Sequence, residues 1–173
     1  SMEICVDSKI PTYSGGLGIL AGDTIKSAAD LGVPMIGVSI LYKKGYLKQS
    51  IDKQGYQQES PDNWNPQDFL TKIPGLVQVE IEQRKVYIQS WLYMIRGIEG
   101  ENVPVFFLDT DLPENSAYDR SLSYYLYGGD EKYRLAQEIV LGIGGIRMLK
   151  ELGFHDVFRY HMNEGHASLL SLE

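Results

Sequence analysis

The chain has 173 residues, of which 43% are hydrophobic and 23% charged, and its formal net charge is −7. Such values are typical of one soluble globular domain. The negative charge argues against nucleic acid as a default partner, because binding to a phosphate backbone needs a basic face. The most apolar stretch, residues 33–42, falls short of the roughly 20 residues that a membrane span needs. Cys5 is the only cysteine and cannot form an internal disulfide, which suits the cytoplasm.

The sequence at each end of the chain predicts a secondary-structure element that the end of the chain interrupts. Residues 1–6 have the pattern of a strand that is under way at Ser1, and residues 167–173 form an amphipathic segment without a stop signal. We therefore expect residues 1–173 to be a partial domain of a longer protein.

The first third of the chain predicts a helix followed by a buried strand. After a turn-rich loop at residues 7–18, apolar residues at 3- and 4-residue spacing predict a helix over residues 17–31, closed by Gly32. Residues 34–42 form an apolar run of the kind expected for a strand buried on both faces. A helix followed by such a strand suggests a parallel, doubly wound arrangement.

The middle of the chain predicts antiparallel structure. Residues 46–59 are polar and aromatic, with a turn at Gln54-Gly55. Residues 77–82 alternate strictly, as a half-exposed strand does, and residues 86–95 are the expected hairpin partner. Residues 103–108 return to an apolar run.

The last third predicts helices and one more strand. One apolar stripe runs from Leu135 to Leu149 and ends at Gly153. Residues 157–161 are predicted to be a short strand, and residues 163–165 a turn before a final helix. Glycine inside a helix costs up to ~1 kcal/mol relative to alanine, so the glycines in the stripe indicate the close approach of a neighbouring element; they are Gly142, Gly144 and Gly145. The fold class predicted is α/β with an antiparallel insertion in the middle.

A glycine-rich run at residues 11–23 carries the strongest chemical signal. Gly15, Gly16 and Gly18 open a helix, whose free amides and dipole attract anions. Two other interpretations remain open. The loop could be a tight turn that needs positive φ, or a dinucleotide site. The dinucleotide fingerprint requires glycines directly after a strand, whereas here about eight residues separate Val6 from Gly15.

Several sequence blocks, in register over nearly the whole chain, resemble those of the α-glucan phosphorylases. The pattern is most similar to the shorter bacterial and archaeal branch of this family. The blocks are Ser1-Met2-Glu3, Ile10-Pro11, Tyr13–Gly18, Ala21-Gly22-Asp23, Ala28–Pro34, Leu41–Tyr46, Leu108–Asp111, Leu126–Asp130, Arg134–Glu138 and His161–Ala167.

The resemblance implies a Rossmann-like lobe of a two-lobed glycosyltransferase of the GT-B type. Such an enzyme splits α-1,4-linked glucan with inorganic phosphate to give glucose 1-phosphate. It also implies pyridoxal phosphate, held by a lysine of a C-terminal lobe that this chain lacks; Lys26, Lys43 and Lys44 read as solvated surface, and none is expected to hold the cofactor. The implied phosphate-binding residues are Gly15, Gly16, Leu17 and Gly18.

The resemblance places a second cluster near the bound glucan. It consists of Asn163, Glu164 and His166, whose local alternative is a helix cap by Asn163. Asp130 resembles an acidic position in a mobile loop that gates the active site, and its alternative is a cap for the following helix. Arg134 is interpreted as a structural ion-pair donor, and the tyrosines at 124–127 as packing within a helix rather than stacking on sugar. No metal site is expected, since His161 and His166 lack the spacing of a helical zinc pair.

The two clusters are predicted to meet. If residues 3–6 and 157–161 are parallel strands of one sheet, the loops that follow them emerge at the same edge, and Gly16 and His166 border one cleft. Two other functions remain open. A starch or glycogen synthase would carry a lysine ahead of the glycines, where Tyr13-Ser14 stands, and a non-enzymatic glucan-binding module would need Trp64 and Trp91 as exposed platforms. The expected partners are glucan and phosphate, with no nucleic acid or membrane, and a homo-oligomer is allowed.

Overall fold

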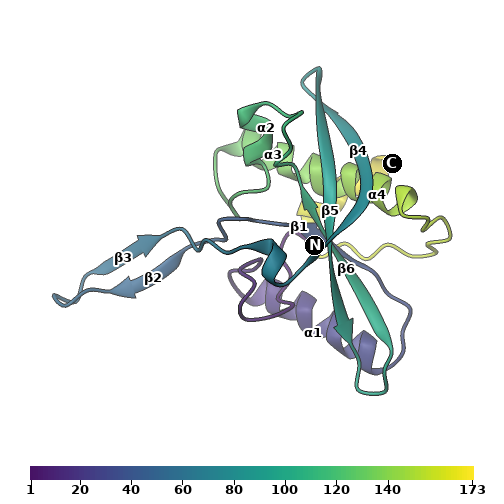
Figure 1. Ribbon diagram of the computed structural model, residues 1–173, viewed down its shortest axis with the longest axis horizontal. Coiled ribbons are helices and arrows are strands. Elements are labelled where there is room, and N and C mark those ends of the chain that lie inside the picture. Colours follow the sequence, from purple (N-terminus) through teal and green to yellow (C-terminus); the bar gives the residue numbers. More distant parts are fainter.

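The computed structural model describes all residues from Ser1 to Glu173 and has three layers (Figure 1). A four-stranded sheet lies between helix α1 (Gly16–Asp30) on one face and helices α3 (Glu131–Ile139) and α4 (Gly145–Glu151) on the other. A short helix, α2 (Ala117–Ser121), follows the sheet. None of the helices has the length and apolar character needed to cross a membrane.

The sheet is mixed and has the order β1-β6-β5-β4. β1 (Gly37–Ile40) pairs in parallel with β6 (Asn102–Asp109), which is antiparallel to β5 (Arg84–Arg96). β5 is in turn antiparallel to β4 (Thr71–Ile81). The α/β fold class with antiparallel strands in the middle is therefore confirmed.

The β4–β5 hairpin turns at two residues, Glu82 and Gln83. Both have positive φ, 48° and 65°, as a type I′ turn requires. This turn matches the right-handed twist of the strands, and the predicted pairing of residues 77–82 with residues 86–95 is confirmed.

Alternate residues of β6 fill the two cores. Val103, Val105 and Phe107 pack on the α1 side, whereas Leu108 packs on the side of α3 and α4. The strand is thus buried on both faces. A third apolar cluster covers the β1 edge and includes Met2, Tyr42, Leu126 and Ala167.

Helix α1 ends as predicted at Gly32. This glycine has a φ of 64°; its amide donates to Ala29 O at 3.3 Å, and the amide of Val33 donates to Ala28 O at 2.8 Å. This pair of bonds is the Schellman arrangement, which satisfies two carbonyls at the helix end.

The glycines between α3 and α4 let neighbouring elements approach closely. They lie in a π-helical segment, Val140–Gly144. A Cβ at Gly142 would come within 2.7 Å of the backbone nitrogen of Leu170, and one at Gly144 within 2.5 Å of Ile88 Cδ1. The predicted close approach is confirmed.

A second, two-stranded hairpin projects from the body of the molecule (Figure 1). It consists of β2 (Lys48–Ile51) and β3 (Gln57–Ser60), and its strand residues are exposed. Gly55, with a φ of 86°, forms the predicted turn. A 3₁₀ turn at Pro66–Asp68 then leads into β4.

Two predicted strands are wrong, and the predicted final helix is a 3₁₀-helix. Residues 2–6 are buried, but their amides bond to a loop and a helix instead of a strand: Ile4 N donates to Thr12 O, and Cys5 N donates to Gly18 O. Residues 157–161 pair with nothing, and Phe158 is 94% exposed. The last segment, Gly165–Leu172, is 3₁₀. The apolar run at residues 34–42 forms a strand only at β1.

Candidate functional site

The glycine loop presents free backbone amides at the start of α1. Gly15 occupies the N-cap position and provides no side-chain cap. The amides of Gly16, Leu17 and Gly18 have no carbonyl to bond within the helix, and none has another hydrogen-bond partner. Gly15 and Gly16 are exposed, and a Cβ at either would meet nothing within 4 Å. An anion can therefore approach these amides, toward the positive end of the helix dipole.

The glycines of this loop are not needed for positive φ. None of Gly15, Gly16, Gly18 and Gly22 has a positive φ, so the interpretation as a strained turn is wrong. Gly18 and Gly22 are needed for packing instead. A Cβ at Gly18 would lie 2.5 Å from Tyr13 Cβ, and one at Gly22 would clash with the carbonyl oxygen of Cys5.

The turn at residues 163–166 lies against the glycine loop. Asn163 Nδ2 donates to Ser1 Oγ at 2.9 Å and to the Leu17 carbonyl oxygen at 3.4 Å. Asn163 does not cap the final helical segment, so that interpretation is wrong; Glu164, exposed and with a φ of 70°, occupies the N-cap position. The two clusters are thus adjacent, although the parallel strands that were predicted to bring them together are not formed.

His166 has one nitrogen without a partner. Its Nε2 lies 3.4 Å from Arg134 Nη2, and its ring centroid lies 6.0 Å from that of Tyr127. Its Nδ1 is enclosed and has no hydrogen-bond partner. Most buried polar atoms in folded proteins have a partner, so this nitrogen is an exception. Arg134 has no carboxylate partner, so its predicted role as an ion-pair donor is wrong; its guanidinium lies over the Tyr127 ring, 6.0 Å from the centroid.

Asp130 caps helix α3. Its Oδ1 accepts a hydrogen bond from Tyr133 N at 2.9 Å, which is the local alternative that the sequence left open. The Asp130 side chain is exposed, and its gating role stays a prediction. The tyrosines at 124–127 lie in turns and not in a helix, so their predicted helical packing is wrong.

Glu3 is a site residue that the sequence analysis did not single out. It is only 2% exposed, and its carboxylate accepts hydrogen bonds from the amides of Ser14 and Gly15 at 2.6 and 3.3 Å. Its other oxygen accepts from Tyr127 Oη at 2.8 Å. The available signal was an acidic residue inside the apolar run at residues 2–6, because Glu is seldom fully buried without partners.

A second polar cluster lies at the carboxyl ends of β1 and β6. Asp109 is fully buried and accepts hydrogen bonds from Gln89 Nε2, Trp91 Nε1, Ser123 Oγ and the amide of Asp111. The Leu-Asp-Thr-Asp block at the end of an apolar run was the signal for it.

Asp111 in this cluster accepts ion pairs from Lys43 and Arg120, both at 2.6 Å. Burial alone would raise the pKa of Asp111, but the hydrogen bonds from Lys43 and Arg120 outweigh it and lower the pKa. Lys43 is therefore an ion-pair partner and not the solvated surface lysine that the sequence suggested.

The two tryptophans are not exposed platforms. Trp91 is buried, with its Nε1 3.0 Å from Asp109 Oδ2, and Trp64 is half-buried, with its Nε1 donating to Tyr42 O. The feature expected of a glucan-binding module is therefore missing at the two positions that could have supplied it.

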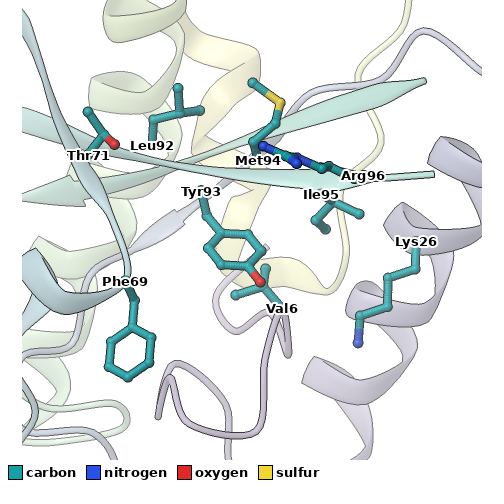
Figure 2. A pocket seen from close by; sticks show the side chains of 9 residues that line it. All are labelled: Val6, Lys26, Phe69, Thr71, Leu92, Tyr93, Met94, Ile95 and Arg96. Atoms are coloured by element: carbon teal, nitrogen blue, oxygen red, sulfur yellow. The ribbon is translucent and has the colours of Figure 1, made fainter. Parts of the chain in front are cut away.

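Two hollows lie outside the glycine loop. One of about 620 Å³ lies beside β5 and α1, and its lining includes Tyr93 with Phe69 on one side and Lys26 on the other (Figure 2). Another of about 200 Å³ borders Arg134 and Leu135 on α3. Neither includes the glycine loop or Asn163, so the cleft shared by Gly16 and His166 stays a prediction. No group of three or more His, Cys, Asp or Glu side chains is arranged to hold a metal ion.

Comparison with known proteins shows which proteins this chain is similar to. Residues 11–91 match the family model described as carbohydrate phosphorylase. Over 99% of its length the chain is 44% identical to a maltodextrin phosphorylase of Thermococcus litoralis, and over its whole length it is 41% identical to a glycogen phosphorylase of Mycobacterium tuberculosis. This chain is related to the carbohydrate phosphorylases. A glycogen phosphorylase of Aquifex aeolicus is 36% identical over 92% of the chain.

The resemblance drawn from the sequence blocks is thereby confirmed. The phosphorylase relatives are much longer than this chain, which spans 21% of the length of the first two and 23% of the third. The matched residues 11–91 contain the glycine loop, and the alignments with the relatives extend over the Asn163–His166 turn as well.

Proposed function

We propose that residues 1–173 are a partial N-terminal domain of an α-glucan phosphorylase of the GT-B type and form its phosphate- and glucan-facing wall. The complete enzyme would cleave the α-1,4 bond of a glucan such as glycogen, starch or maltodextrin with inorganic phosphate and release glucose 1-phosphate. The names of the relatives support this activity, since they are maltodextrin and glycogen phosphorylases.

The observation that carries the proposal is the contact between the two candidate clusters. The hydrogen bond from Asn163 to the Leu17 carbonyl holds the turn at 163–166 beside the first turn of α1. This arrangement brings free amides, which suit an anion, next to amide and imidazole groups, which suit sugar hydroxyls. The facing lobe of the complete enzyme would supply the other wall of the predicted cleft.

The phosphate side of the reaction needs donors and no base. A phosphate oxygen forms a bond to C1 of the terminal glucose while the bond from C1 to the leaving oxygen breaks, and a proton must reach that leaving oxygen. Positive charge develops at C1, so amides that fix the anion also place the nucleophile. We assign this role to Gly15, Gly16, Leu17 and Gly18. The amides of Gly16, Leu17 and Gly18 have no partner within the chain, whereas the amide of Gly15 is already bonded to Glu3.

The sugar side would use the turn at 163–166. His166 Nδ1 is enclosed and has no partner within the chain, so a shift of the side chain would expose it to a sugar hydroxyl, to which it can donate or from which it can accept, depending on its tautomer. Asn163 and the exposed Glu164 complete this side, and Asp130 stands at the start of α3 as the proposed gate.

The resemblance implies pyridoxal phosphate, which would supply a phosphate group for proton transfer in the complete enzyme. The lysines of this chain do not fit its attachment. None of them is buried; Lys43 is paired with Asp111, and Lys44 lies over the rings of Tyr124 and Tyr125. We derive no step through this cofactor and propose that its lysine lies outside residues 1–173. We also propose a cytoplasmic enzyme that can form homo-oligomers.

The test is an assay of the complete enzyme with two glucosyl acceptor reactions. With maltoheptaose and inorganic phosphate, we expect release of glucose 1-phosphate. With maltoheptaose and a nucleotide-activated glucose, we expect no chain elongation. Elongation without phosphorolysis would show a synthase instead, and binding of maltoheptaose with neither reaction would show a glucan-binding protein.

A further inference from the structure

The carboxylate of Glu3 is buried without a cation. It makes no ion pair, and its four hydrogen-bond donors are Tyr127 Oη, Gly15 N and the amide and hydroxyl of Ser14. Burying a charge is costly unless donors replace the lost water. A carboxylate held by several backbone amides is a strong, charge-assisted arrangement. These hydrogen bonds therefore hold Glu3 and the segment that leads into α1 in a fixed position relative to each other.

Glu3 bonds the residues that lead into α1 but does not cap the helix. The helix has Gly15 at its N-cap position and no acidic residue in its first turn. The Glu3 carboxylate supplies negative charge there from outside the helix, and it takes the amides of Ser14 and Gly15. The amides of Gly16 and Leu17 are left without a partner, and a Cβ at Gly16 would meet nothing within 4 Å. The carboxylate thus divides the loop into a bonded half and an open half.

Gly18 makes room for this carboxylate. A Cβ at Gly18 would lie 2.9 Å from Glu3 Oε2 and 3.2 Å from Glu3 Cγ. Any other residue at this position would displace Glu3 from the loop. Position 18 therefore requires glycine because of this contact, and not because of a positive φ.

Tyr127 holds the other oxygen of Glu3. Its hydroxyl donates at 2.8 Å to Glu3 Oε1, and its backbone has a φ of 57°, a strained value for a non-glycine residue. Burial and the nearby Glu3 raise the pKa of Tyr127, so the phenol keeps its proton. The Tyr127 ring lies next to His166 and beneath Arg134, and it therefore also faces the turn at 163–166.

We propose that Glu3 and Tyr127 are positioning residues for phosphate, which orient the glycine loop so that the amides of Gly16 and Leu17 face the anion. The pair itself does not touch phosphate, since the Glu3 carboxylate occupies the amides of Ser14 and Gly15 and its negative charge would repel an anion in direct contact. This inference rests on the proposed function. It predicts a selective effect on phosphate, because the pair bonds to the loop and not to the residues assigned to the sugar.

The test is Tyr127→Phe in the complete enzyme, which removes the donated hydrogen bond and keeps the ring beside His166. Losing one hydrogen bond to a charged group corresponds to about a tenfold change. We expect the KM for phosphate to rise about tenfold and the KM for maltoheptaose to stay within about twofold. Glu3→Gln keeps one acceptor oxygen and replaces the other by an NH₂ donor, so it cannot accept hydrogen bonds from both the amides and the phenol. It should also raise the KM for phosphate. The matched control is Tyr118→Phe, the same change at an exposed tyrosine of α2.

A second readout does not depend on activity. Hydrogen exchange at the amides of Ser14 and Gly15 should become at least about tenfold faster in Tyr127→Phe and Glu3→Gln, and stay unchanged in Tyr118→Phe. An unchanged KM for phosphate in both variants, or an equal rise in both KM values, would overturn the proposal. Absence of phosphorolysis in the unsubstituted enzyme would overturn the proposed function. The exchange measurement stands apart from it: unchanged hydrogen exchange at Ser14 and Gly15 in the two variants would overturn the ordering role of Glu3 and Tyr127.

Discussion

At the scale of single residues, the glycines of residues 15–22 divide into two kinds. Gly15 and Gly16 lie in open space, whereas Gly18 and Gly22 are surrounded by other atoms. Gly18 faces Glu3 and Tyr13, and Gly22 faces the backbone of Cys5. The same residue type thus keeps a surface clear for a ligand at one end of the run and allows close packing at the other.

Gly22→Ala should destabilise the protein although alanine is the better helix former. Alanine in a helix interior gains about 1 kcal/mol over glycine. The added Cβ would clash with the Cys5 carbonyl oxygen, which is backbone and cannot turn away, and overpacking of this kind costs about 1–3 kcal/mol. We expect a net loss of about 1 kcal/mol in urea unfolding. The control, Gly16→Ala, should not lose stability, and a Gly22→Ala variant more stable than the parent would contradict the packing.

At the scale of elements, the sequence correctly predicted the features that depend on a local residue pattern. The end of α1 at Gly32, the turn at Gly55 and the β4–β5 hairpin follow from glycine placement and alternation, which act over a few residues. Residues 2–6 have the composition of a strand, but their amides bond to the loop at Thr12 and to Gly18. No periodicity reveals a choice between distant hydrogen-bond partners.

The candidate site, like the fold, was predicted only in part. The glycine loop and the turn at 163–166 were found from motif blocks, and their contact was predicted from a sheet topology that is wrong. Glu3 and Tyr127 lie 124 positions apart in sequence, and their hydrogen bond depends on tertiary packing. Single-sequence reasoning found the parts of the site and missed the carboxylate that bonds to the glycine loop and to Tyr127.

The N-cap of helix α3, Asp130, is predicted to contribute to the stability of the protein. Asp130→Ala should lower stability by about 1 kcal/mol, because the Tyr133 amide loses its acceptor. Asp130→Asn should restore most of that loss, since Asn and Asp cap equally well. Urea unfolding of the complete enzyme measures both changes. Equal losses in the two variants would contradict the cap, and a drop in turnover of Asp130→Asn at unchanged stability would support the proposed gating role.

At the scale of the whole molecule, the chain shows a core on each face of its sheet together with large exposed apolar side chains. Phe158 is 94% exposed, Ile98 87% and Leu31 78%. Roughly four-fifths of the sequence of these two phosphorylase relatives lies outside the aligned region, because the chain covers 21% of their length. We propose that these side chains are covered in the complete enzyme, whose other lobe would face the glycine loop.

The central claim is that the open amides at Gly16 and Leu17 bind the reacting phosphate. Phosphorolysis of maltoheptaose by the Gly16→Val form of the complete enzyme tests it most directly. The valine side chain would occupy the open space in front of the amides, and its backbone needs no positive φ, so folding should change by less than about 0.5 kcal/mol. Losing donors aimed at a reacting oxygen costs about 100-fold or more in turnover. We expect a folded variant with turnover reduced at least about 100-fold; a folded variant with the parent's turnover and KM for phosphate would contradict the account.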